Sequence, residues 1–111
     1  MIHNMNLAPS AFGAICLGQK TVEMRLYDEK RAKINVGDEI IFENTVTHQK
    51  IRCVVTNLAR YNSFFELYSQ YDKVALGYSK QETANAKDMY AYYSAESIER
   101  YGVLAIELKL L

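Results

Sequence analysis

The stretch from Thr21 to Tyr27 constrains the fold of this chain most strongly, because polar and apolar residues alternate there without a break. Successive side chains of a β-strand point to opposite faces, so this period of two predicts a strand with one buried and one polar face. The predicted apolar face holds Val22, Met24 and Leu26, and the other face holds Thr21, Glu23, Arg25 and Tyr27. Lys20 precedes this strand, and Asp28 and Arg31 follow it. A hydroxyl, a carboxylate, a guanidinium and a phenol in series exceed what a solvent-facing surface needs, and they predict a site that recognises, or acts on, a polar ligand.

The length and composition indicate one globular domain spanning residues 1–111. Half of the 111 residues are hydrophobic and under a quarter are charged, which is ordinary for a globular protein. A chain of this length buries roughly two thirds of its unfolded surface. We find no internal repeat, low-complexity tract or linker rich in proline, glycine or serine, so a second domain is not expected.

The charge balance limits the kinds of partner. Thirteen basic residues match thirteen acidic ones, and the formal net charge is zero. Non-specific nucleic-acid binding depends on neutralised phosphates, so any nucleic-acid contact is expected in a local groove or pocket. The N-terminus lacks the pattern of a signal peptide, and no apolar run approaches the roughly 20 residues that cross a bilayer. We therefore expect no membrane association.

The cysteines and histidines predict neither a disulfide framework nor a metal site. Cys16 and Cys53 are isolated, and His3 and His48 are the only histidines. No Cys-x-x-Cys spacing is present, so the pattern favours small core residues in a reducing cytoplasm. We expect no cofactor.

The remaining pattern predicts strands early and late in the chain, with helical segments between them. A helix begins near Pro9 and ends before Gly18, and it leads into the strand at 20–27. Further strands are expected at 39–43, 50–58 and 103–110, with a hairpin loop at 44–49. Helical signals cover 63–71, 86–93 and 94–102, and the segment 79–82 repeats the Ser-x-x-Glu capping pattern of residues 63–66. In the last strand, Leu104, Ile106, Leu108 and Leu110 are expected to face inward.

A short sheet hides its edges most readily by closing on itself. We therefore predict an α+β fold, a small β-barrel of about five or six mostly antiparallel strands with short helices at its periphery. The C-terminal strand is expected to complete the barrel.

Two adjoining motifs resemble the signature of a known family. They read Gly18-x-Lys20-Thr21-Val22-Glu23-x-Arg25-Leu26-x-Asp28-x-Lys30-Arg31 and Ile34-x-Val36-Gly37-Asp38-x-Ile40-x-Phe42. Segments at 64–68, 72–78, 92–94 and 101–103 fit the same pattern. The combined pattern covers the chain roughly from Met5 to its end. It resembles the ASCH domain (activating-signal-cointegrator homology), a division of the PUA-like superfamily.

The resemblance implies a PUA-like β-barrel with a cleft that binds RNA or coregulator complexes. One bacterial branch of the family hydrolyses the acetyl amide of an acetylated cytidine with a lysine, a threonine and a distant glutamate. Lys20 matches that lysine, whereas Glu23 stands at the threonine position. Glu82 and Asp72 are the nearest candidates for the distant glutamate.

Lys20 and Glu23 are the candidate catalytic pair. A lysine acts as nucleophile or base only when burial or a nearby cation lowers its pKa, and a carboxylate beside it instead holds the amine charged. On an ideal strand the two side chains point to opposite faces, so they share a pocket only if the backbone bends near Gly18–Thr21. Otherwise Lys20 is a lysine that reaches past the rim of the barrel to solvent.

Two interpretations of Glu23 and Arg25 remain open. One is an exposed ion pair worth less than about 1 kcal/mol. The other is a preset pair in which Arg25 donates to a phosphate or base edge and Glu23 accepts from an amino group. Asp28 and Arg31 form either a solvated loop or a local basic contact.

Aromatic residues complete the candidate site. Nine tyrosines are present, and tyrosines stack on the bases of single-stranded RNA. Tyr68 lies on a helical stripe and is expected to pack in the core, whereas Tyr27, Tyr78, Tyr90 and Tyr93 are available to a ligand.

The leading hypothesis is a domain that binds RNA, a nucleoside or a nucleotide in a polar cleft at the barrel opening. The predicted ligand-binding residues are Lys20, Thr21, Glu23, Arg25, Tyr27, Asp28, Arg31 and Tyr78. The alternative is an amidohydrolase that deacetylates an acylated nucleoside such as acetylcytidine. A third class, a protein-interaction module, predicts an exposed apolar patch without a convergent polar cleft.

Overall fold

The computed structural model describes all residues from 1 to 111. Its elements, in chain order, are β1 (Ile2–Leu7), α1 (Pro9–Cys16), β2 (Val22–Leu26), the 3₁₀ turn η1 (Arg31–Lys33), β3 (Glu39–Asn44), β4 (Lys50–Tyr61), α2 (Phe64–Tyr68), α3 (Lys73–Leu76), the 3₁₀ turn η2 (Ala86–Ala91), α4 (Ala95–Tyr101) and β5 (Val103–Leu110).

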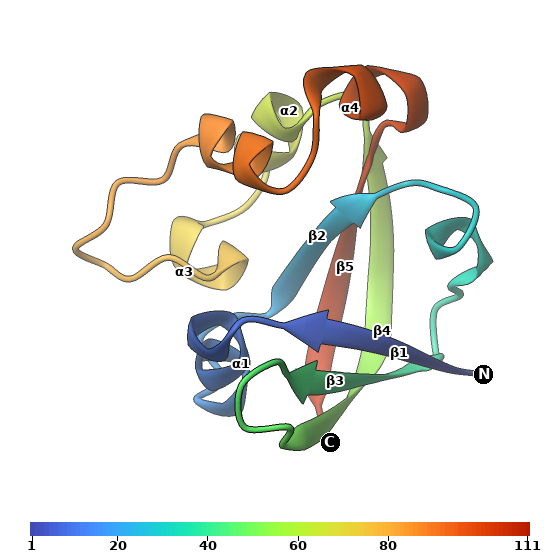
Figure 1. The fold of residues 1–111 in the computed structure, drawn as a ribbon, viewed down its shortest axis with the longest axis vertical. Coiled ribbons are helices and arrows are strands. Elements are labelled where there is room, and N and C mark those ends of the chain that lie inside the picture. The colour runs from blue at the N-terminus through green and yellow to red at the C-terminus, as the bar shows by residue number, and fades with distance from the viewer.

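The strands form one curled sheet in the order β1-β3-β4-β5-β2 (Figure 1). β1 runs parallel to β3, and the other three pairings are antiparallel. The two edge strands, β1 and β2, approach each other without backbone pairing, and a side-chain hydrogen bond from Arg25 to the Asn6 carbonyl joins them. The predicted α+β class, a small and mostly antiparallel barrel-like sheet with short peripheral helices, is confirmed.

The closure of the sheet differs from the prediction. β5 was expected to complete the barrel, but it lies inside the sheet between β4 and β2. The two edge strands are β2 and β1, and β1 is a strand that the sequence pattern did not predict. Its alternation is short, and asparagine, a poor strand former, occupies two of its exposed positions, Asn4 and Asn6. Burial of Met5 and Leu7 in the core holds this strand in place.

Two hydrophobic cores lie on opposite faces of the sheet, because alternate residues of β5 belong to different cores. The first core lies within the curl and includes α1 with strands β1, β3 and β4. The second core lies between β2 and β5 on one side and α2, α3, η2 and α4 on the other, and these helices cover that face (Figure 1). Val22, Met24 and Leu26 belong to it, as the alternation of β2 predicted.

β5 is therefore buried on both faces, which corrects the expected pattern of its side chains. Val103 and Ala105 are fully buried together with Ile106, whereas Leu110 at the end of the strand is 40% exposed. A central strand that is covered on both sides becomes apolar throughout.

The helical segment 63–93 is broken into short pieces. Ser63 caps α2 by accepting the N–H of Glu66, as predicted, but α2 ends at Tyr68, before the end of the expected stripe. At the second capping pattern, the N–H of Ser79 donates to the Glu82 carboxylate at 2.8 Å in a turn without a helix behind it. None of the helices combines the length and the apolar character that crossing a bilayer requires.

Candidate functional site

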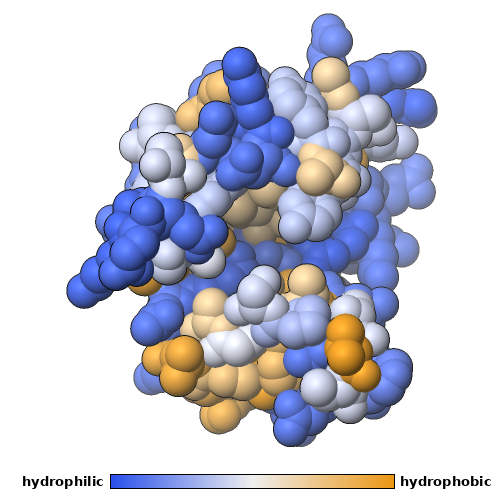
Figure 2. All heavy atoms as spheres, turned by 60° about the vertical axis from the view of Figure 1, so that its left-hand side comes forward, coloured by the Kyte–Doolittle hydropathy of each residue, from blue (hydrophilic) through white to orange (hydrophobic).

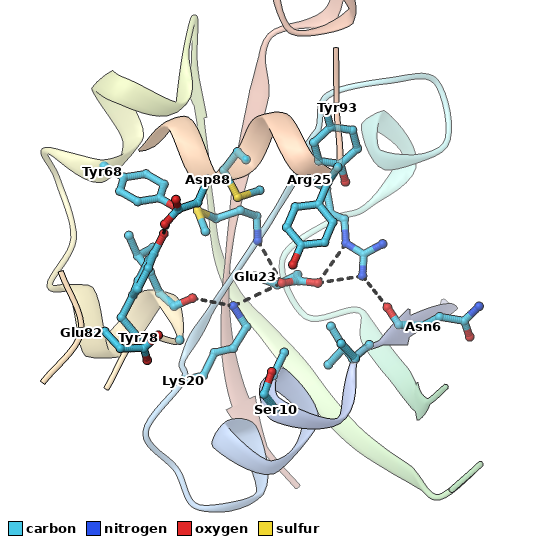
Figure 3. Close-up of a pocket in the computed structure, with 18 residues that line it drawn as sticks. Asn6, Ser10, Lys20, Glu23, Arg25, Tyr68, Tyr78, Glu82, Asp88 and Tyr93 are labelled. Atoms are coloured by element: carbon cyan, nitrogen blue, oxygen red, sulfur yellow. Dashed lines mark hydrogen bonds and ion pairs between the residues drawn. The ribbon is translucent and has the colours of Figure 1, made fainter. Parts of the chain in front are cut away.

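A cleft of about 380 Å³ opens beside β2, an edge strand that pairs with β5 on one side and with no strand on the other. α1 and the end of β1 form one wall, and residues from α2 to η2 form the other. Figure 2 shows this cleft as a recess across the face, with hydrophilic side chains gathered in it. Figure 3 shows Lys20, Glu23 and Arg25 at its centre, joined by hydrogen bonds and ion pairs.

Lys20 is buried at the base of the cleft, with 4% of its side chain exposed. Its Nζ donates to the carbonyls of Val22 and Leu76, each at 2.8 Å, and lies 3.3 Å from Oε1 of Glu23. An ammonium group has three N–H donors, and these three oxygens account for all of them. The Lys20 side chain is thus fully engaged by the protein's own oxygens.

The backbone bend that the sequence hypothesis required is present before β2. The N–H of Lys20 donates to the Ala14 carbonyl, and the N–H of Thr21 donates to the Ala75 carbonyl. Lys20 therefore lies outside the strand, which begins at Val22 instead of at residue 20, although the Thr21 carbonyl still accepts the N–H of Leu108 in β5 at 2.8 Å. Because Lys20 is not part of the strand, the alternation of β2 does not keep it from Glu23.

Gly77 shapes the other side of the Lys20 site. Its φ of +113° lies in the region that side-chain-bearing residues rarely adopt. A Cβ at this position would lie 3.2 Å from Cδ and 3.4 Å from Nζ of Lys20. The glycine thus lets the chain after α3 pass directly over the lysine side chain.

Glu23 is the anion between two cations. Its Oε1 accepts the Met24 N–H at 3.2 Å and faces Lys20, and its Oε2 accepts Nε and Nη2 of Arg25 at 2.9 and 2.7 Å. Burial by itself raises the pKa of this carboxyl, but the charges of Lys20 and Arg25 and their hydrogen bonds outweigh it, so the pKa lies below its usual 4.5. Glu23 is therefore ionised at neutral pH.

Arg25 joins the two edges of the sheet. Its Nη2 also donates to the Asn6 carbonyl of β1 at 2.9 Å. The side chains of Arg25 and Glu23 are 14% and 8% exposed, so their pair is not the solvent-exposed ion pair of the first interpretation. The three charged side chains fill the gap where no backbone ladder connects β1 with β2.

Two tyrosines and an aspartate form the opposite wall. The Tyr78 hydroxyl lies 2.8 Å from both the Tyr68 hydroxyl and Oδ2 of Asp88. Burial, followed by the bonds to Tyr68 and Asp88, raises the pKa of Tyr78 well above its usual value of 10. Burial also raises the pKa of Tyr68. Both phenols are therefore neutral hydrogen-bonding groups.

The structure brings four of the eight predicted ligand-binding residues into the cleft: Lys20, Glu23, Arg25 and Tyr78. The other four, Thr21, Tyr27, Asp28 and Arg31, do not line it. Thr21 is an exposed residue held by its backbone, and the Tyr27 ring lies 3.7 Å below the Arg60 guanidinium. Asp28 and Arg31 pair with each other at 2.9 Å.

The cleft also contains residues that the sequence did not indicate. Asp88 and Asn6 carried no signal, since Asn6 acts through its backbone carbonyl. Tyr68 was assigned to the core, and its ring does pack there, but its hydroxyl reaches the cleft. Glu82, a candidate carboxylate by resemblance, lines the cleft, whereas Asp72 caps α3 by accepting the Val74 N–H.

The fold and the site define a small α+β domain with a curled five-stranded sheet and a buried charged cleft at its open edge. The family model of the ASCH domain matches residues 5–111, and the chain belongs to this family. Membership supports a function related to RNA binding.

Solved structures agree with this assignment. The crystal structure of the hypothetical protein PH0355 is 30% identical with a TM-score of 0.85, and the match covers 100% of both chains. The solution structure of PF0455 from Pyrococcus furiosus is 31% identical with a TM-score of 0.77, covering 100% of this chain and 98% of that one. The ASCH protein from Zymomonas mobilis shares the fold at 18% identity and a TM-score of 0.68, over 97% of this chain and 66% of that one. No curated protein matches.

Proposed function

We propose that this ASCH domain binds RNA, a nucleoside or a nucleotide, with one base held in the cleft beside β2. The observation that carries the proposal is the convergence of buried charges and tyrosines on one recess. Its volume of about 380 Å³ lies within the usual range for small-ligand pockets. A convergent polar cleft also favours ligand binding over a protein-interaction module.

The hydrogen bonds that Glu23 already makes determine what it can offer to a base in the cleft. A carboxylate has about four lone-pair positions. Those of Glu23 are taken by Lys20, the Met24 N–H and two bonds from Arg25. We therefore assign Glu23 a positioning role, in place of direct contact with an amino group of the ligand.

Arg25 is the donor that remains for a ligand. Its Nε and Nη2 are engaged, but its Nη1 donates to no protein acceptor. Glu23 and the Asn6 carbonyl fix the plane of the guanidinium, so Nη1 is a pre-oriented donor for a carbonyl or phosphate oxygen. Asp88 and Glu82 line the same cleft and supply acceptors for an exocyclic amino group.

The charge of the cleft favours a base over a chain of phosphates. Two cations, Lys20 and Arg25, face three carboxylates, Glu23, Glu82 and Asp88. A triphosphate would meet this excess of negative charge, whereas a neutral base with both donors and acceptors would not. Tyr92 and Tyr93 line the cleft as well and offer aromatic faces for stacking.

The test is a binding titration with a panel of nucleosides, nucleoside monophosphates and a mixed-sequence RNA dodecamer at low salt. We expect Arg25→Gln to weaken binding at least tenfold, since the oriented donor is lost. Arg52→Gln is the matched control, because Arg52 pairs with Glu39 at 2.6 Å outside the cleft. Circular dichroism of each variant checks the fold. Absence of measurable binding to every probe would overturn the proposal.

The alternative is hydrolysis of an acylated nucleoside such as acetylcytidine. What favours it is the presence of Lys20 and three carboxylates in one cleft of suitable size. It requires that Lys20 transfer a proton to the adjacent Glu23 carboxylate and release one of its three acceptors, because an ammonium has no lone pair with which to attack. Incubation with acetylcytidine, followed by chromatography, tests it. Turnover that disappears in Lys20→Met would support hydrolysis, and no turnover by the unmodified protein would reject it for this substrate.

We further propose a cytoplasmic location. Cys16 and Cys53 are both free thiols, and Cys53 is completely buried in the first core. Unpaired cysteines of this kind are typical of proteins in a reducing compartment.

A further inference from the structure

A second hollow, of about 590 Å³, lies at the end of the sheet where β4 ends and β5 begins. Its lining residues come from 60–62, Glu66 and 99–102, and none of them lines the cleft beside β2. α2 and α4 lie together at this end, near the tip of β4 (Figure 1). This hollow is therefore separate from the site described above.

The arginines distinguish this hollow from the rest of the surface. The chain has five arginines, and three of them, Arg25, Arg31 and Arg52, lie within 2.9 Å of a carboxylate oxygen. The guanidinium groups of Arg60 and Arg100 have neither an ion pair nor a hydrogen bond within the protein, and both residues line the second hollow. The two unpaired guanidinium groups of the protein thus lie at one place.

Each of these guanidinium groups rests on an aromatic ring. The Arg60 Cζ lies 3.7 Å from the centre of the Tyr27 ring, and the Arg100 Cζ lies 5.1 Å from the centre of the Tyr101 ring. A ring beneath the flat face leaves the N–H edge of the guanidinium free to donate. The two arginines are oriented donors without an acceptor.

The backbone beneath Arg60 is built to hold Tyr27. The N–H of Tyr27 donates to the Gly102 carbonyl at 3.0 Å, which fixes the end of β2 against the start of β5. Gly102 has a φ of +71°, and a Cβ there would lie 3.1 Å from the Tyr61 carbonyl oxygen. Only glycine fits this approach without a shift of the backbone.

The remaining polar groups leave room for an anion. The side-chain amide of Asn62 makes no hydrogen bond, whereas its backbone N–H donates to Oε2 of Glu66 at 3.3 Å. Glu66 is thus turned toward the start of its own helix, in the capping box that begins at Ser63. Glu99 is the other carboxylate, so the hollow suits a singly charged phosphodiester better than a polyphosphate.

The position of the hollow relative to the cleft indicates the ligand. Arg25 lies in the cleft, and Tyr27, the platform of Arg60, follows it by two residues, directly after the end of β2. A nucleic-acid strand with one base in the cleft would thus meet Arg60 next to the end of β2. We propose that Arg60 and Arg100 bind backbone phosphodiesters of a single-stranded RNA. This inference rests on the proposed function of the cleft for the identity of the strand.

The experiment compares an RNA dodecamer with a nucleoside across a range of salt concentrations. The variant is Arg60→Gln/Arg100→Gln, and the control is Arg52→Gln. For single strands, each phosphate contact contributes about −0.7 to the slope of log K against log salt. Loss of two contacts is expected to make the slope shallower by about 1.4 and to weaken dodecamer binding about tenfold at low salt. Nucleoside affinity and the control remain at the values of the unmodified protein.

The outcomes separate this inference from the proposed function. An unchanged salt slope in the double variant, or no dodecamer binding by the unmodified protein, overturns the inference, even when the nucleoside still binds. A shallower slope in the double variant supports it, even when no nucleoside binds and the proposal for the cleft fails. An equal drop in nucleoside affinity would show that the variant disturbs the cleft and would also overturn the inference. Thermal unfolding confirms that both variants are folded.

Discussion

Replacing Glu23 with glutamine removes the negative charge that lies between Lys20 and Arg25. The exposed fractions of the Glu23, Lys20 and Arg25 side chains are only 8%, 4% and 14%, so water compensates little for the lost charge. Removing one partner of a buried ion pair typically costs about 3–5 kcal/mol. Glutamine retains one oxygen acceptor, so we expect the lower end, about 3 kcal/mol.

Urea unfolding at pH 7, followed by circular dichroism, measures this loss. The midpoint is expected to fall with an unchanged slope, and the melting temperature is expected to fall by about 12 °C, at roughly 4 °C per kcal/mol for a chain of this size. Glu39→Gln is the matched control. It removes the carboxylate of an Arg52 pair whose side chains are 54% and 33% exposed, and should cost less than about 1 kcal/mol.

The pH dependence gives an independent check on Glu23. Its pKa is lowered in the folded protein, so the unfolded chain takes up the proton at a higher pH than the folded one does. The stabilisation is therefore complete well above pH 4.5 and is lost as the pH falls below that value. The difference between the unmodified protein and Glu23→Gln should shrink in acid.

A double-mutant cycle with Lys20→Met locates the energy in the pair. We expect a coupling energy of about 2 kcal/mol between Lys20 and Glu23, since the two groups are in direct contact. Equal losses of stability in Glu23→Gln and Glu39→Gln, together with no coupling in the cycle, would show that the buried charges of Lys20, Glu23 and Arg25 do not stabilise one another.

Three further changes test other parts of the structure. Gly77→Ala should lower stability by about 1–2 kcal/mol, measured by urea unfolding, because it strains a left-handed residue and crowds Lys20; an unchanged midpoint would contradict this. Tyr78→Phe removes the hydroxyl that bonds to Asp88 and should lower the free energy of unfolding by about 1 kcal/mol. Because the pKa of Tyr78 is raised in the folded protein, the stabilisation by its hydroxyl is present below about pH 10 and is lost in stronger alkali. The stability of the variant should therefore fall less steeply above about pH 10 than that of the unmodified protein. The pKa of Asp38 is lowered to about 2, chiefly by its hydrogen bond with His3 of β1. The stabilisation by the Asp38 carboxylate is therefore lost as the pH falls from about 4 toward 2. Asp38→Asn should make the loss of stability in acid, measured by urea unfolding, less steep.

The local patterns of the chain were sufficient to predict most of the elements. Strict alternation predicted β2 with its apolar face, and Pro9 and Ser63 marked the starts of α1 and α2. These signals are local, since a strand or a cap needs only its own residues and their immediate neighbours. β1 escaped prediction because its place depends on β3, a partner more than 30 residues away.

The residues of the candidate site were predictable in part, for the same reason. Lys20, Glu23 and Arg25 stand close together in the chain, and their chemistry was evident before the fold was known. Asp88 and the Tyr68 hydroxyl lie in the cleft because segments more than 40 residues farther along the chain fold back over β2, and no local pattern records that. The aromatic platform under Arg60 has the same origin, since Tyr27 directly follows β2 whereas Arg60 belongs to β4.

The amino-acid sequence by itself determined the class of the fold, the polar character of the β2 segment and the pairing of opposite charges along it. The tertiary structure decided where those charges point. A turn before Val22 carries Lys20 out of the strand, and the open edge between β1 and β2 leaves backbone carbonyls that the side chains of Lys20 and Arg25 satisfy. The physical reason is that buried polar groups require partners. Only the folded chain determines which groups are buried together.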